Sequence, residues 1–261
     1  MFSFMQYLQR IMAALQNQTI SDLVAQNSIH AAVLYHFGVK FYDYQEATLQ
    51  EVCEKHGLSL SAVVKGLESG VEPALKSELQ LVAYPIDLVL EYLTHTHHLF
   101  VKKRLPYIAQ LIDGLEEVNF RYKSLSTDLK QVFPLFVEDF IHHIYEEEDT
   151  LFSYIRQLTR FLAGESAGTG LYYAMERNAI REFALEHEEH DHEMEGLNKI
   201  TNGYSYCNEA DLHIKVLFDE LGRFEKDLLT HARIEDEILF PKALQLERQV
   251  KFKFYEIIKQ N

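Results

Sequence analysis

The chain has 261 residues, of which 47% are hydrophobic, so it can bury a sizeable core as one large domain or two. Its formal net charge of −15, from 40 acidic and 25 basic residues, argues against unspecific binding to nucleic acid or to an anionic membrane surface. It has no stretch of about 20 apolar residues, which argues against a membrane span.

The start of the chain and its cysteines indicate the compartment. Residues 1–10 lack the positively charged region of a signal peptide, and Arg10 interrupts the apolar stretch. Cys53 and Cys207 are the only cysteines, too few for a disulfide framework, and they suit a reducing compartment. We therefore expect a cytoplasmic protein.

The first part of the chain predicts a small helical N-terminal domain over residues 1–74. Residues 1–17 have apolar side chains at helical spacing, which serve either self-association as a homodimer or packing on the rest of the chain. Beyond them, capping residues precede short apolar runs that end at Gly38, Gly57 and Gly70. A joint containing proline follows.

Residues 85–245 show helical periodicity without strand alternation, which predicts an antiparallel four-helix bundle. The expected helices run from Asp87 to Leu115, from between Ser126 and Pro134 to beyond Phe152, over Glu186–Ile200, and from Asn208 to Phe240, with Pro241 ending the fourth. The glycine-rich stretch 163–170 separates two helical hairpins. The fold class is therefore expected to be all-α.

Two stretches of the bundle repeat one pattern of metal-binding side chains. His143 and His231 are each followed four residues later by a glutamate, Glu147 and Glu235, and four residues after that by Leu-Phe. Residues four apart lie on one face of a helix, so each imidazole and its carboxylate point into the same space. One such pair is more often a solvated helix face, but its repetition favours a site for two metal ions.

The other two helices offer further candidate ligands. The first carries the histidines at 95, 97 and 98, and the third carries Glu186, His187, Glu188, Glu189, His190, Asp191 and His192. An exposed polar face is the alternative for both groups, and it is favoured for the histidines other than His98 and His190. For His98 and His190 both interpretations stay open, although the two are separated along the chain by nearly the same interval as His143 and His231.

Together these motifs resemble hemerythrin-like di-iron bundles, and the whole chain resembles bacterial iron-sulfur cluster repair di-iron proteins. The resemblance rests on His97-His98 ahead of Leu105-Pro106, the two His-x-x-x-Glu-x-x-x-Leu-Phe stretches, and Glu189-His190-Asp191. It implies two non-haem iron ions joined by an oxo bridge. The implied terminal ligands are His98, His143, His190 and His231, and the implied bridging carboxylates are Glu147 and Glu235.

This ligand set leaves metal identity and further ligands to be decided. Imidazole and carboxylate donors would also accept manganese or zinc. Six protein ligands do not saturate two octahedral ions, so positions stay open for oxygen or nitric oxide. Glu186 lies four residues before His190, where oxygen-carrying hemerythrins have another histidine. It is either a weak ligand or proton relay near the metals, or a solvated glutamate.

The N-terminal domain departs from the repair family at one motif. Phe41 and Thr48-Leu49 match the family, but the Cys-Cys motif that follows the phenylalanine is replaced here by Tyr42-Asp43. The thiolates that would pass electrons or handle iron are therefore absent from this position. Thiol-dependent donation of iron is in doubt, whereas the bundle site is unaffected.

Three functions are compatible with these observations. The resemblance favours a stress-response di-iron protein that repairs iron-sulfur clusters damaged by nitric oxide or oxidants, with the damaged proteins as partners. The second is a sensor or buffer of oxygen, nitric oxide or iron without repair activity. The third is a structural bundle that binds no functional metal. Whether the protein is an enzyme stays open.

Overall fold

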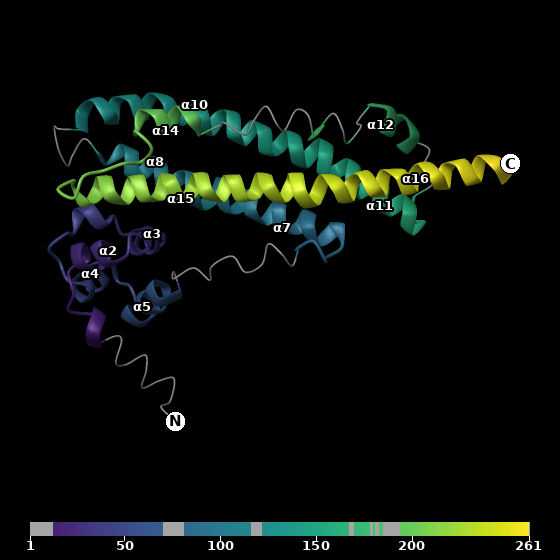
Figure 1. The fold of residues 1–261 in the computed structure, drawn as a ribbon. Coiled ribbons are helices and arrows are strands. Elements are labelled where there is room, and N and C mark those ends of the chain that lie inside the picture. Colours follow the sequence, from purple (N-terminus) through teal and green to yellow (C-terminus); the bar gives the residue numbers. More distant parts are fainter. Residues whose placement is uncertain are drawn as a thin grey trace. The chain divides into compact units, whose positions relative to one another are not determined.

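The computed structural model describes residues 13–69, 81–115, 122–166, 170–177 and 194–260, with positions 180, 183 and 184. Within these ranges every regular element is helical, apart from an isolated bridge between Thr19 and Thr48. The expected all-helical bundle is confirmed (Figure 1). No helix in these ranges is long and apolar enough to span a membrane. Most of the expected helix over residues 1–17 lies outside the described part.

The chain divides into two compact units, and each unit joins separate stretches of sequence. The first comprises residues 1–74, 107–127 and 201–223, and the second comprises 75–106, 128–200 and 224–261. The first unit therefore contains the expected N-terminal domain together with two stretches that we had assigned to the bundle. Its assembly depends on contacts between residues far apart in the chain.

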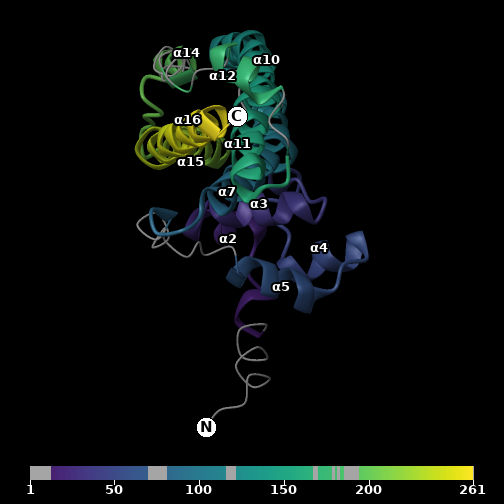
Figure 2. The same ribbon diagram turned by 90° about the vertical axis from the view of Figure 1, so that its right-hand side faces the viewer.

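Short helices and a 3-10 turn make up the described residues in the N-terminal part of the first unit (Figure 2). They are α2 (Ile20–Gln26), α3 (Ile29–His36), η1 (Phe41–Asp43), α4 (Leu49–His56) and α5 (Leu60–Ser69). Thr48 and Glu51 form a capping box at the start of α4, with each side chain bonded to the other's backbone N–H. Gly57 ends that helix in the left-handed conformation, at φ 65°.

Tyr42 packs on a buried histidine in the same unit. Its ring stacks on His213 of α15 (Leu212–Ile234), with centroids 4.6 Å apart. The His213 Nε2 group lies 2.7 Å from the carbonyl oxygen of Leu111, on α8 (Leu105–Asp113). Tyr42 thus helps to join three stretches of the first unit.

Gly114 has no side chain, and the rings of Tyr42 and His213 occupy the space where a side chain would lie. A Cβ atom there would lie 2.8 Å from Tyr42 Cζ and 2.9 Å from His213 Cε1, closer than carbon atoms pack. We expect Gly114→Ala to lower the free energy of unfolding by about 1–3 kcal/mol, the usual cost of overpacking. Urea unfolding measures it. Gly196→Ala is the matched control, because the nearest atom to its Cβ would be 3.8 Å away, and an equal loss there would contradict the explanation.

The same histidine makes stability depend on pH. Burial lowers the pKa of His213, although the Leu111 carbonyl and Asp211 act in the opposite sense. The unfolded chain then binds a proton more readily than the folded protein, so stability should fall as the pH drops below about 6.5. Urea unfolding at roughly pH 7.5 and 5.5 measures the loss of stability between these two pH values, and this loss should be smaller for His213→Gln than for wild type. Exposed His56, changed to Gln, is the control, and equal losses in all three proteins would contradict this account.

The second unit contains the long helices and its own hydrophobic core. Its elements include α7 (Ile86–Leu99), η2 (Phe100–Arg104), most of α10 (Lys123–Glu146), η4 (Glu147–Phe152), α11 (Ser153–Ala163), α12 (Leu171–Arg177), α14 (Glu195–Ile200), η5 (Glu235–Leu239) and α16 (Phe240–Gln260). In this unit α11 packs along α16, and α7 contacts η5 (Figure 1). Core residues from these helices include Leu93, Phe152, Leu158 and Leu239.

Three segments of the second unit, η2, η4 and η5, are π-helical, and two of them precede a proline. Leu105 and Phe240 each donate their N–H to the carbonyl five residues earlier, of Phe100 and of Glu235. A proline ring in an α-helix clashes with the carbonyl four residues earlier, and a wider π turn relieves that clash. The helices therefore continue through Pro106 and Pro241. The expectation that Pro241 ends the fourth helix is wrong, because α16 extends to Gln260.

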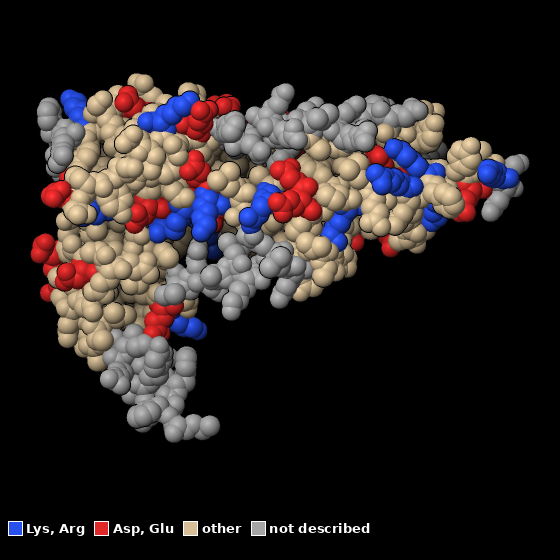
Figure 3. Space-filling view, in the orientation of Figure 1, with Lys and Arg blue, Asp and Glu red and all other residues tan. Residues whose placement is uncertain are grey.

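Charged side chains of both signs are interspersed over the face shown in Figure 3. In the second unit, opposite charges form ion pairs such as Arg104 with Asp227 at 2.7 Å and Lys251 with Glu247 at 2.9 Å. The acidic excess of the sequence is therefore mixed with basic side chains on this face.

Candidate metal centre

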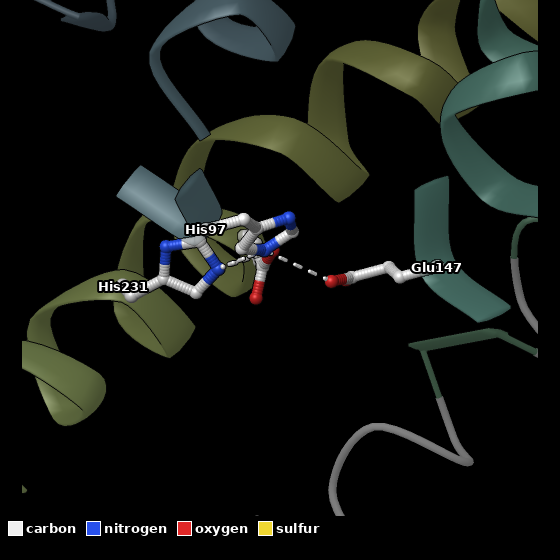
Figure 4. Close-up of side chains that lie close together, drawn as sticks. His97, Glu147 and His231 are labelled. Atoms are coloured by element: carbon white, nitrogen blue, oxygen red, sulfur yellow. Dashed lines mark hydrogen bonds and ion pairs between the residues drawn. The ribbon is translucent and has the colours of Figure 1, made fainter. Parts of the chain in front are cut away.

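Four buried side chains of the second unit bring their metal-binding atoms together. They are His97 of α7, Glu147 of η4, His231 of α15 and Glu235 of η5, and one ligand atom from each lies within 4.8 Å of all the others. Figure 4 shows His97 and His231 facing each other, with Glu147 extending toward them. Two imidazoles and two carboxylates thus converge from separate parts of the chain.

The individual distances place the two histidines at the centre of this group. The Nε2 atoms of His97 and His231 are 2.9 Å apart. His231 Nε2 lies 3.0 Å from Glu235 Oε1, and His97 Nε2 lies 3.4 Å from Glu147 Oε2. Both imidazoles therefore present the same nitrogen to the space that the carboxylates border.

Aromatic rings pack beside the two histidines. Phe152 stacks parallel to His97, with centroids 5.7 Å apart, and Phe100 meets the His231 ring edge-on at 5.7 Å. Phe100 in turn contacts Phe140 and Phe224. These rings replace water around the donors, so charges inside the group interact more strongly than they would in solvent.

The surroundings favour the metal-binding form of His97. Burial, and then the neighbouring His231, lowers the pKa of His97, although Glu235 and Glu148 act in the opposite sense. A neutral imidazole carries the lone pair that binds a metal. The His231 Nδ1 atom is buried without a hydrogen-bond partner among the described residues.

This chemistry fits a metal ion. Glu147 and Glu235 are 6% and 1% exposed, and burying two carboxylates so close together costs free energy unless a positive charge compensates. Neutral imidazoles and carboxylates are suitable donors for first-row transition metals, including iron, manganese and zinc. A cation among the four donors would neutralise the carboxylates and accept both imidazole lone pairs.

The structure differs from the sequence expectation at the first helix. His97 is 2% exposed and belongs to the group, whereas its neighbour His98, which we expected there, is exposed. Val89, Leu93 and His97 lie four residues apart on the buried face of α7, so helical periodicity places His97 inward. The expectation followed the family resemblance, whereas the buried face of this one helix carries His97.

The remaining expected ligands are placed as follows. Glu147, His231 and Glu235 are all in the buried group, as the two repeated motifs predict. His143 is half-buried on α10, four residues before Glu147, and is outside this group. Glu186 and His190 lie outside the described residues, so their roles stay predictions.

Sequence reasoning missed one neighbour of the group. Glu148 Oε1 lies 2.8 Å from His97 Nδ1, the nitrogen that faces away from the other donors. In the sequence it is one of four consecutive acidic residues, Glu146 to Asp149, and nothing in their composition distinguishes it. Its partner is 51 positions away, so only the fold shows the contact.

The bundle matches a family of cation-binding domains. The hemerythrin HHE cation-binding domain family matches residues 89–243, which is more than half of the chain. The iron-sulfur cluster repair protein YtfE of Cronobacter sakazakii is 22% identical over 235 residues, covering 90% of this chain and 100% of that protein. The protein of the same name from Musicola paradisiaca is 25% identical over 233 residues, covering 89% and 98%.

The helical bundle and its buried His/Glu group thus define a metal-binding bundle. The chain belongs to the hemerythrin HHE cation-binding domain family. It also resembles iron-sulfur cluster repair proteins along about nine-tenths of its length, which confirms the resemblance inferred from the sequence motifs.

Proposed function

We propose that this protein is a di-iron stress-response protein that restores iron-sulfur clusters damaged by nitric oxide or oxidants. The observation that carries the proposal is the buried group of His97, Glu147, His231 and Glu235. It lies in a chain that is similar, over nearly its full length, to proteins named for iron-sulfur cluster repair.

The proposed centre holds two iron ions. Glu147 and Glu235 would hold them as bridging carboxylates, His97 and His231 would be terminal ligands, and His143 and His190 would complete the set from the second and third helices. When bound, an oxo-bridged iron pair supplies redox chemistry and open positions for oxygen or nitric oxide. His97 takes the place that we had expected for His98. Glu186 is kept as a candidate weak ligand or proton relay near His190, with a solvated glutamate as the alternative.

The protein's own side chains prepare this centre in three ways. The two glutamates offset the positive charge of the metals, and His97 is kept neutral and ready to bind. Phe100 and Phe152 pack on the imidazoles and keep bulk water from that side of the centre. Access by a small gas is compatible with such packing, whereas a large substrate would have to react at the protein surface.

The proposed partners are damaged iron-sulfur proteins, with nitric oxide or oxygen as the small ligand and the cytoplasm as the compartment. Tyr42 is engaged in packing on His213, so this position does not offer a thiolate for iron transfer. We infer that this position takes no part in delivering iron to a damaged cluster.

The test is a purified repair assay. A cluster enzyme inactivated by nitric oxide should regain activity with the iron-loaded wild-type protein and should not with Glu147→Ala at equal concentration. Iron content and optical spectra of both proteins accompany the assay, with about two irons per chain expected for wild type. Two bound irons without recovery of the enzyme would favour the sensor or buffer function. Absence of bound iron from wild type would overturn both.

A further inference from the structure

Glu148 forms a hydrogen bond with His97, a proposed metal ligand, at the ring nitrogen that points away from the other donors. Its Oε1 atom lies 2.8 Å from His97 Nδ1, while His97 Nε2 faces the His231 nitrogen at 2.9 Å on the opposite side of the ring. Since a carboxylate only accepts, the Nδ1–H of His97 donates to Glu148. The Nε2 lone pair of the neutral ring is then directed at the other donors.

The contact also fixes the plane of the imidazole. Phe152, from the same π-helical segment as Glu148, stacks on the His97 ring with an interplanar angle of 7°. The hydrogen bond defines the rotation of the ring within its plane, and the stacking defines the plane itself. Because Glu147 begins this segment, η4 supplies one carboxylate to the donor group and a second to the back of its histidine.

We propose that Glu148 is a positioning residue that selects the Nδ1–H tautomer of His97 and strengthens its Nε2 atom as a metal ligand. This inference rests on the metal centre put forward under the proposed function. A carboxylate behind a metal-bound histidine orients the ring and raises its basicity, and loss of such a partner typically costs about 10–100-fold in metal affinity. A more basic ligand also favours the oxidised metal.

The experiment compares Glu148→Gln and Glu148→Ala with the wild type. Glutamine retains a neutral acceptor for Nδ1–H, whereas alanine removes it, so Fe(II) affinity should fall in the order wild type, Gln, Ala. The alanine variant should lose about 10–100-fold, measured by competition with a chromogenic chelator. The reduction potential of the iron-loaded protein should rise in the same order. Asp149→Asn is the matched control, because Asp149 is the adjacent exposed acid on η4.

The outcomes separate this inference from the proposed function. Wild type that binds no iron would overturn the proposed centre itself. Wild type that binds iron, with unchanged affinity and potential in both Glu148 variants, would overturn the positioning role alone. Thermal unfolding of the metal-free variants controls for folding, and the isosteric glutamine variant retains the test if the alanine variant does not fold.

Discussion

His97→Ala is expected to lose bound iron, whereas His98→Ala should retain the wild-type content of about two irons per chain. The two residues are adjacent and chemically identical, but His97 is buried in the donor group and His98 is exposed. Removing a terminal ligand from a metal ion typically costs far more than removing a solvated side chain, because the open position cannot be filled by the surrounding phenylalanine rings.

The measurement is metal analysis with optical spectra after iron loading and removal of excess metal. Oxo-bridge absorption should be weakened or absent for His97→Ala and unchanged for His98→Ala. The reverse result would show that His98 faces the centre in the metal-loaded protein. Circular dichroism of both variants provides the control, since equal helical content excludes unfolding as the cause of metal loss.

Removing the metals is expected to lower the thermal unfolding midpoint by roughly 8–16 °C. A ligand at about 1,000 times its dissociation constant stabilises the folded state by about 4 kcal/mol, and each kcal/mol shifts the midpoint by about 2–4 °C in proteins of this size. Here the buried carboxylates Glu147 and Glu235 add to the effect, since their negative charges repel each other when the cation is absent.

Calorimetry of the iron-loaded and the chelator-treated protein checks this expectation. The double variant Glu147→Gln and Glu235→Gln is informative, because neutral amides remove both the metal affinity and the repulsion. Its midpoint should not change with chelator and should lie above that of metal-free wild type. Identical midpoints for loaded and metal-free wild type would contradict a role for metal in stability.

The sequence was most informative where the pattern is local. The repeated His-x-x-x-Glu motifs pointed to Glu147, His231 and Glu235, which lie together in one buried group, whereas His143 of the same motifs lies outside it. The all-helical fold followed in the same way from periodicity and from capping residues such as Thr48. These features depend on neighbours within one or two turns, which a single sequence displays.

Features that depend on distant contacts or on helix irregularity could not be predicted in this way. A π turn holds more residues than an α turn, so counting along a regular helix becomes unreliable near η2 and η5. This is also why Pro241 does not end its helix. The contact between Glu148 and His97 spans 51 positions, and that between Tyr42 and His213 joins two stretches far apart in the chain.

The first unit is assembled from three separate stretches of the chain, which pack on one another. His213, Leu111 and Tyr107 belong to stretches of this unit that come much later in the chain than residues 1–74. Tyr42 covers His213, and Tyr35 packs on Tyr107 with ring centroids 5.0 Å apart. Removing residues 1–74 would therefore expose these buried side chains. We therefore expect substitutions in residues 1–74 and in the helices that they cover to be coupled in their effect on stability.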